Sequence, residues 1–205
     1  MKVIFYDWGG LNVWLFHLIN NVRFDYLDSA MLAGTALANH QLFTVYIAAF
    51  SLLAFIAIAR AQPDNQAQYR AQTLRWMSAI AVFSIAYVLD GWLLTVLKPL
   101  LDFPRPPLAL PVGTQFIVGQ PEYHHSLPSG HASFAMLVVA STWPVLARWQ
   151  KIGGIVFVVW VGLSRISLGA HFPADVLAGW LSSLLLVLLV SSIVSNMHTA
   201  KPTTG

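Results

Sequence analysis

Five apolar stretches constrain the fold of this chain more than any other feature of its sequence. They are residues 42–59, 74–97, 132–147, 152–168 and 174–194. Each is close to the roughly 20 residues that a helix needs to cross the hydrocarbon core of a bilayer. Hydrophobic residues make up 57% of the 205 residues and charged residues only 9%, which is more apolar than a soluble domain requires. The sequence therefore predicts an all-α integral membrane protein, with residues 1–205 forming a single membrane-embedded domain.

The ends of the chain are less apolar than its centre. In residues 1–40, an apolar segment around Trp14 lies among polar residues such as Asp7 and Asn20. This mixture favours an N-terminal interfacial helix, with a sixth, weakly hydrophobic span as the alternative. We therefore expect a bundle of five to six transmembrane helices. Residues 62–66 are predicted to form a short loop and residues 196–205 a flexible tail.

Basic residues outside the polar clusters predict the orientation of the bundle. They flank the loops on one side of the expected membrane and are Arg60, Arg70, Arg75, Arg148 and Lys151. Loops rich in Lys and Arg stay in the cytoplasm. We therefore expect a multi-pass protein of a bacterial-type inner (cytoplasmic) membrane. The opposite helix ends, which carry three polar clusters, are then predicted to face the periplasm or exterior.

The first polar cluster is Lys98 and Arg105, which follow the second long apolar stretch. Several prolines, beginning with Pro99, are expected to stop the helix and turn the chain. Such a turn can direct both cations at one anion, since Arg offers a planar fork for phosphate oxygens and Lys a compact charge. Alternatively, both side chains extend into lipid headgroups at the end of a span.

The second cluster is Ser129, Gly130 and His131, directly before an apolar stretch. Ser129 occupies the position of a helix N-cap, where free backbone N–H groups and the helix dipole attract anions. His131 can donate a proton near neutral pH because the ordinary pKa of histidine is about 6.5. The simpler interpretation is an N-cap followed by an interfacial histidine.

The third cluster is Arg165, His171 and Asp175. Gly169 is predicted to end one helix and Pro173 to begin the next. His171 and Asp175 are four residues apart, so the carboxylate can hold one imidazole nitrogen and leave the other free as a base or nucleophile. Asp175 at the edge of the hydrocarbon needs a partner. A structural His–Asp pair that closes a turn is the alternative.

Together, the clusters provide the parts of metal-free phosphoryl transfer through a covalent histidine. No carboxylate set for magnesium and no zinc motif is visible, so the sequence predicts no metal and no cofactor. The chain has no cysteine, which excludes thiol catalysis. Residues 98–175 are thus the predicted catalytic motif region.

These residues resemble the type 2 phosphatidic acid phosphatase superfamily. Its pattern is Lys-x6-Arg-Pro, then Pro-Ser-Gly-His, then Ser-Arg-x5-His-x3-Asp, and each spacing is present between Lys98 and Asp175. The resemblance implies that His171 attacks phosphorus, that Asp175 orients it and that His131 protonates the leaving group. The residues it implies for binding the phosphate are Lys98, Arg105, Ser129, Gly130 and Arg165. The family also includes soluble vanadium-dependent haloperoxidases, which this short, apolar chain does not resemble.

The expected substrate is a lipid phosphate, and the expected partners are membrane lipids and no nucleic acid. Undecaprenyl pyrophosphate, phosphatidylglycerol phosphate, phosphatidic acid and lipid A are the candidates implied by the resemblance. Two alternatives are a lipid phosphotransferase that uses the same phosphohistidine, and a non-catalytic lipid-phosphate binder or carrier. Three further residues are candidates for headgroup contact or support: intramembrane Asp90, and His124 and His125 in the loop before the second cluster.

Overall fold

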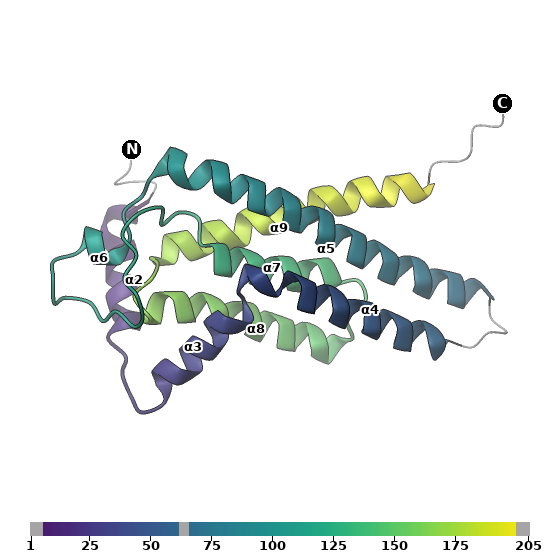
Figure 1. Ribbon diagram of the computed structural model, residues 1–205, viewed down its shortest axis with the longest axis horizontal. Coiled ribbons are helices and arrows are strands. Elements are labelled where there is room, and N and C mark those ends of the chain that lie inside the picture. The colour runs from purple at the N-terminus through teal and green to yellow at the C-terminus, as the bar shows by residue number, and fades with distance from the viewer. Residues whose placement is uncertain (1–5, 62–65, 200–205) are drawn as a thin grey trace.

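The computed structural model describes residues 6–61 and 66–199, and its regular elements are helices (Figure 1). In chain order they are η1 (Trp8–Gly10), α2 (Leu11–Asn20), α3 (Leu27–Leu37), η2 (His40–Leu42), α4 (Phe43–Ala59), α5 (Gln66–Leu101), α6 (Pro106–Ala109), α7 (Gly130–Thr142), α8 (Arg148–Ser167) and α9 (Pro173–Thr199). The five predicted apolar stretches correspond to α4, α5, α7, α8 and α9. The all-α prediction is therefore confirmed.

Within residues 6–61 and 66–199, three helical segments are long and apolar enough to cross a membrane. They are His40–Ala59, Gln66–Ala109 and Pro173–Met197, with mean hydropathies of 2.4, 2.0 and 2.3. Large apolar side chains such as Phe55, Val88 and Leu185 are exposed on these helices, as expected for surfaces that contact lipid. Helix α8 has 20 residues and α7 only 13, so the five helices of the bundle differ in length.

The short helix α7 lies at the centre of the bundle, among α5, α8 and α9 (Figure 1). Nine of its 13 residues are buried, as expected for a helix that is apolar on all sides. Phe134 and Leu137 pack with Phe83 of α5 and Val187 of α9. At its N-terminal end, Gly179 of α9 lies so close that an added Cβ would be 2.5 Å from the carbonyl oxygen of Ser129. This close packing fixes the start of α7 against α9.

Several predicted boundaries were wrong. The stretch predicted to reach residue 147 is helical only to Thr142, because Pro144 lacks an N–H and disfavours helix before it. Pro99 does not stop α5, since the last turn continues to Leu101 and the chain leaves it at Asp102, whose φ is 37°. Lys98 therefore lies within the last turn of α5.

Another wrong boundary is the start of the tail. Helix α9 continues past residue 196 to Thr199. The sequence has no glycine or proline between residues 180 and 201 that could end the helix earlier. Residues 62–65 of the predicted loop and residues 200–205 of the predicted tail lie outside the described residues. Gln66, the last residue of that loop, begins α5.

The N-terminal region forms two short helices, α2 of 10 residues and α3 of 11. Each is about half the length that a membrane span needs. Helix α2 lies across one end of the bundle (Figure 1), with Trp14 and Leu18 exposed as on an interfacial helix. On its other side, the buried Asn12 accepts a hydrogen bond from the backbone N–H of Ala174 at 2.9 Å.

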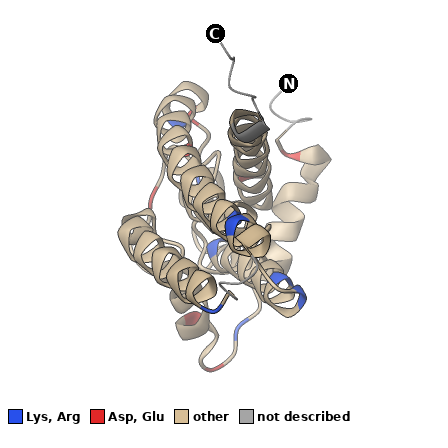
Figure 2. Cartoon of the chain, turned by 90° about the vertical axis from the view of Figure 1, so that its right-hand side faces the viewer, with Lys and Arg blue, Asp and Glu red and all other residues tan. Residues whose placement is uncertain are grey.

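Basic residues gather at the opposite end of the bundle (Figure 2). This end is formed by the last residues of α4 and the first residues of α5 and α8. Arg60, Arg70, Arg75, Arg148 and Lys151 belong to these segments. The positive end and the three polar clusters are therefore at opposite ends of the molecule.

Candidate active site

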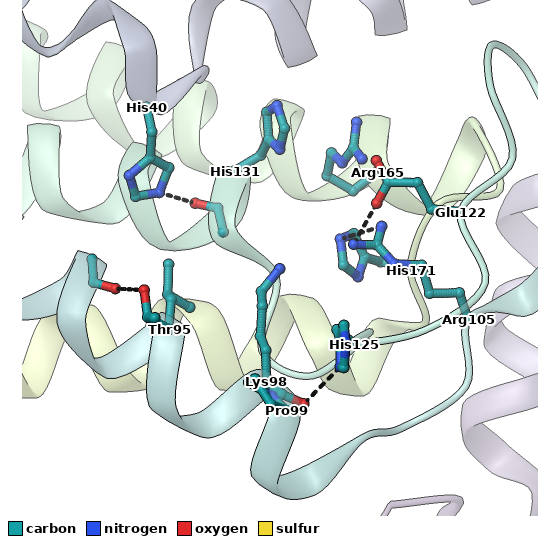
Figure 3. Close-up of a pocket in the computed structure, with 13 residues that line it drawn as sticks. His40, Thr95, Lys98, Pro99, Arg105, Glu122, His125, His131, Arg165 and His171 are labelled. Carbon is teal, nitrogen blue, oxygen red and sulfur yellow. Dashed lines mark hydrogen bonds and ion pairs between the residues drawn. The ribbon is translucent and has the colours of Figure 1, made fainter.

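The three polar clusters meet at the end of the bundle that carries α2 and α6. A cavity of about 560 Å³ lies among them (Figure 3). Six of the predicted catalytic and phosphate-binding residues line it: Lys98, Arg105, Gly130, His131, Arg165 and His171. The remaining lining residues are His40, Gly91, Leu94, Thr95, Pro99, Glu122 and His125. Residues more than 70 positions apart in the sequence, such as Lys98 and His171, thus line the same cavity.

The sequence turns sharply between α8 and α9, and this turn places His171 and Asp175. Gly169 follows α8 with a φ of 76°, a left-handed conformation that favours glycine. Pro173 then begins α9, as predicted, and Asp175 lies in its first turn. The Nδ1 atom of His171 lies 3.3 Å from Oδ2 of Asp175, and both side chains are fully buried. The predicted His–Asp pair is present.

The hydrogen-bond partners of His171 determine its tautomer. Its Nε2 atom lies 3.3 Å from Nη1 of Arg105, and a guanidinium group can only donate. Nε2 is therefore the acceptor, and Nδ1 carries the proton toward Asp175. Burial lowers the pKa of His171 well below its ordinary value, and the nearby Arg105 and Arg165 lower it further. The imidazole is neutral at neutral pH, with a lone pair on Nε2.

The carboxylate of Asp175 has three further partners, which the sequence did not predict. Ser126 donates to its Oδ2 at 2.5 Å, and the backbone N–H of Phe172 donates to the same oxygen at 2.8 Å. The hydroxyl of Tyr6 donates to Oδ1 at 2.8 Å. This buried charge is therefore fully hydrogen-bonded, as burial requires.

All three nitrogens of the Arg105 guanidinium group have partners that hold it in place. Its Nε donates to the carbonyl oxygen of His124 at 2.9 Å, and Nη1 donates to that of Ala170 at 3.3 Å. Nη2 forms an ion pair of 2.6 Å with Glu122, whose side chain is largely exposed. The one carboxylate that lines the cavity thus occupies a position on Arg105 that an anionic ligand needs.

The other two cations of the site have no carboxylate partner within 4.0 Å among the described residues. Arg165 is buried; its Nη1 donates to the hydroxyl of Thr35 at 3.3 Å, and its Nε has no partner in the described part of the chain. Lys98 points from the last turn of α5 toward the cavity (Figure 3). Two unneutralised cations beside Arg105 make the cavity strongly attractive to an anion.

The N-terminus of α7 forms one wall of the cavity. Ser129 is its N-cap residue, as predicted, but the side chain makes no cap hydrogen bond. Its buried hydroxyl has no partner among the described residues. Gly130 and His131 line the cavity, and His40, to which the sequence gave no role, lies 2.9 Å from the carbonyl oxygen of Gly130. Free N–H groups at this helix end suit an anion.

The three candidate support residues have different positions. Asp90 is fully buried and accepts hydrogen bonds from Ser133 at 2.5 Å and Ser183 at 2.9 Å, and its Oδ2 lies 4.0 Å from Nε2 of His40. His125 lines the cavity, with its Nδ1 3.1 Å from the carbonyl oxygen of Lys98. His124 contributes only its carbonyl oxygen, to Arg105. Within residues 6–61 and 66–197, no group of three His, Asp or Glu side chains could hold a metal ion.

Comparison with known proteins identifies the family. The model of the PAP2 superfamily matches residues 79–198, which include all three clusters. The chain belongs to this superfamily.

Two solved structures resemble this fold. The crystal structure of Aquifex aeolicus LpxE has a TM-score of 0.69 and 25% identity, covering 89% of this chain and 95% of that chain. A transmembrane PAP2-type phosphatidylglycerolphosphate phosphatase from Bacillus subtilis also has a TM-score of 0.69, with 22% identity over 97% of this chain and 92% of that chain. The chain thus has the fold of membrane PAP2 phosphatases.

Curated relatives match parts of the chain. An undecaprenyl-diphosphatase of Sulfolobus acidocaldarius is 40% identical over 57 residues, or 28% of this chain and 28% of that protein. A lipid A 1-phosphatase of Rhizobium johnstonii is 30% identical over 118 residues, or 55% of this chain and 47% of that protein. The chain thus spans less than half the length of these curated relatives. These two relatives are phosphatases of undecaprenyl diphosphate and of lipid A.

The ion pair of Glu122 with Arg105 predicts the effect of removing one charge. Glu122→Gln should tighten the binding of inorganic phosphate or orthovanadate about two- to fivefold, because the carboxylate competes with these anions for Arg105. The dissociation constants can be measured from thermal stabilisation of the purified protein. Asp102→Asn is a matched control, since this exposed carboxylate faces His124 and His125 and makes no described ion pair with Arg105. Equal effects of both variants would contradict competition at Arg105.

Proposed function

We propose that this chain hydrolyses a lipid phosphomonoester or pyrophosphate through a phosphohistidine on His171. The observation that carries the proposal is the carboxylate-oriented imidazole of His171, which lines a cavity with three cations and whose Nε2 lone pair is held by a hydrogen bond from Arg105 Nη1. A binder or carrier of lipid phosphates needs cations but no neutral, carboxylate-oriented imidazole. The PAP2 family assignment supports the same reaction.

In the first step, Nε2 of His171 attacks phosphorus and the bond from phosphorus to the lipid oxygen, or to the leaving phosphate, breaks. Arg105 releases Nε2 of His171 and Glu122 and binds phosphate oxygens in their place, while Arg165 and Lys98 neutralise charge on the others. The Gly130 amide and the Ser129 hydroxyl complete the anion site. A bound phosphate favours the protonated form of His131, which gives its proton to the leaving oxygen, and Asp175 stabilises the positive charge that develops on His171.

In the second step, water attacks the phosphohistidine. His131, now neutral, accepts a proton from this water, the phosphorus–nitrogen bond breaks and inorganic phosphate leaves. Neutral His171 is restored. The positive charges that phosphoryl transfer requires come from Lys98, Arg105 and Arg165, so we propose a metal-independent reaction without a cofactor.

The substrate is a lipid whose headgroup enters beside α5. Gly91, Leu94 and Thr95 of this helix line the cavity, and the neighbouring Trp92 and Val96 are exposed on its outer surface. An amphiphile can therefore keep its acyl chains outside the bundle while its phosphate reaches His171. Undecaprenyl pyrophosphate, phosphatidylglycerol phosphate, phosphatidic acid and lipid A all present such a phosphate.

The site faces the periplasm or exterior of a bacterial-type inner membrane. This orientation is supported by the basic residues at the opposite end of the bundle, which the positive-inside tendency keeps in the cytoplasm.

Phosphate release in excess EDTA tests the reaction. The purified protein should release phosphate from at least one of the four lipids, and His171→Ala should lower the rate by several orders of magnitude because the nucleophile is lost. His17→Ala on α2 is the control, since this histidine lies outside the cavity. Label that moves to an acceptor lipid without release of phosphate would indicate a transferase. A rate of His171→Ala within about tenfold of wild type would exclude His171 as the nucleophile.

Cysteine labelling tests the orientation, because the chain has no native cysteine. Val112, 98% exposed beside the site, and Ala67, exposed at the opposite end, are suitable positions for single cysteines. In cells with an accessible periplasm, a membrane-impermeant maleimide should label Val112→Cys directly and Ala67→Cys only after permeabilisation. The reverse pattern would place the site in the cytoplasm.

A further inference from the structure

The N-terminal segment reaches the centre of the site through one side chain. The hydroxyl of Tyr6 donates to Oδ1 of Asp175 at 2.8 Å, across 169 positions of sequence. Tyr6 precedes η1 and belongs to a region without a recognisable motif. The three polar clusters do not assign Tyr6 a role in the reaction.

The two oxygens of Asp175 are held from different sides. Oδ2 accepts from Ser126 and from the backbone N–H of Phe172, and it is the oxygen that faces Nδ1 of His171. Among the described residues, Tyr6 is the one donor to Oδ1. A carboxylate held at one oxygen can still rotate about its Cβ–Cγ bond, whereas bonds at both oxygens fix its plane. Tyr6 therefore completes the restraint on this group.

The phenol of Tyr6 is itself firmly positioned. Its ring stacks on Phe103 with centroids 4.1 Å apart and meets Phe172 edge-on at 6.2 Å. Burial and the adjacent charge of Asp175 raise the pKa of the phenol above its ordinary value. The hydroxyl consequently stays protonated at neutral pH and remains a donor.

A second contact docks the same segment without touching the carboxylate. Asn12 accepts from the backbone N–H of Ala174, one residue before Asp175. The N-terminal segment thus has one contact that only attaches it to α9 and another that reaches the charge beside His171. The two contacts allow attachment and positioning to be separated by substitution.

We propose that Tyr6 is a positioning residue for the reaction, which holds the Asp175 carboxylate so that Oδ2 stays directed at Nδ1 of His171. This inference rests on the proposed function, because it assumes that Asp175 orients the nucleophile. The N-terminal segment then takes part in turnover through the contact between Tyr6 and Asp175, in the first turn of α9. A segment that merely covers the bundle end would not need a hydroxyl at this position.

Tyr6→Phe tests the proposal, because it removes one oxygen and keeps the ring that packs on Phe103. The variant should be folded, with kcat about 10- to 100-fold lower, as for the loss of a hydrogen bond to a charged group. The KM should stay within about twofold of wild type, because Tyr6 does not line the cavity where the phosphate binds. An unchanged kcat would overturn the proposal.

Two comparisons separate positioning from attachment. In an Asp175→Ala background no carboxylate remains to be held, so adding Tyr6→Phe should lower the residual rate no further. Asn12→Ala weakens attachment alone and should lower kcat less than Tyr6→Phe does. If Tyr6→Phe lowers the rate by the same factor in the wild-type and Asp175→Ala proteins, Tyr6 only attaches the segment. The same conclusion would follow if Asn12→Ala lowered kcat as much as Tyr6→Phe does. Near wild-type activity of Asp175→Ala would instead refute the proposed function.

Discussion

The burial of one carboxylate, Asp175, is the constraint on which the rest of the site depends. An unpaired charge at the edge of a hydrocarbon region costs several kcal/mol, so the fold must bring it partners. Those partners come from distant parts of the chain: Tyr6 before η1, Ser126 from the loop before α7, and His171 and the Phe172 amide from the turn before α9. The satisfied carboxylate in turn fixes the imidazole that faces the cavity.

The position of α7 makes this arrangement possible. A 13-residue helix is too short to extend over the length of α5 or α9, and it lies between them with its N-terminus below the cavity. Gly179 allows α9 to approach Ser129 closely. Asp90 is buried in the same region, where Ser133 and Ser183 satisfy its charge. The anion site is thereby built on packed helices, while the loop before α7 contributes Glu122 and Ser126.

The sequence predicted the elements that depend on local rules and missed those that depend on distant contacts. Apolar stretches located the five bundle helices, and the turn around Gly169 and Pro173 followed from backbone preferences. Motif spacing located the three cations that line the cavity, and two of its histidines, His131 and His171. Tyr6, Thr35 and His40 were missed because each contacts its partner across at least 90 positions and no periodicity marks them. Pro99 misled the prediction because a proline in the last turn of a long helix removes one hydrogen bond without ending it.

Trapping the covalent intermediate tests the central claim most directly. Purified protein would be mixed with a lipid labelled in its phosphate, quenched in alkali within milliseconds, where phosphohistidine is stable, and digested for mass spectrometry. The account predicts an acid-labile phosphoryl group on the peptide that contains His171, formed and lost at rates compatible with turnover. Turnover without any phosphoryl group on His171, or with the group on another residue, would contradict it.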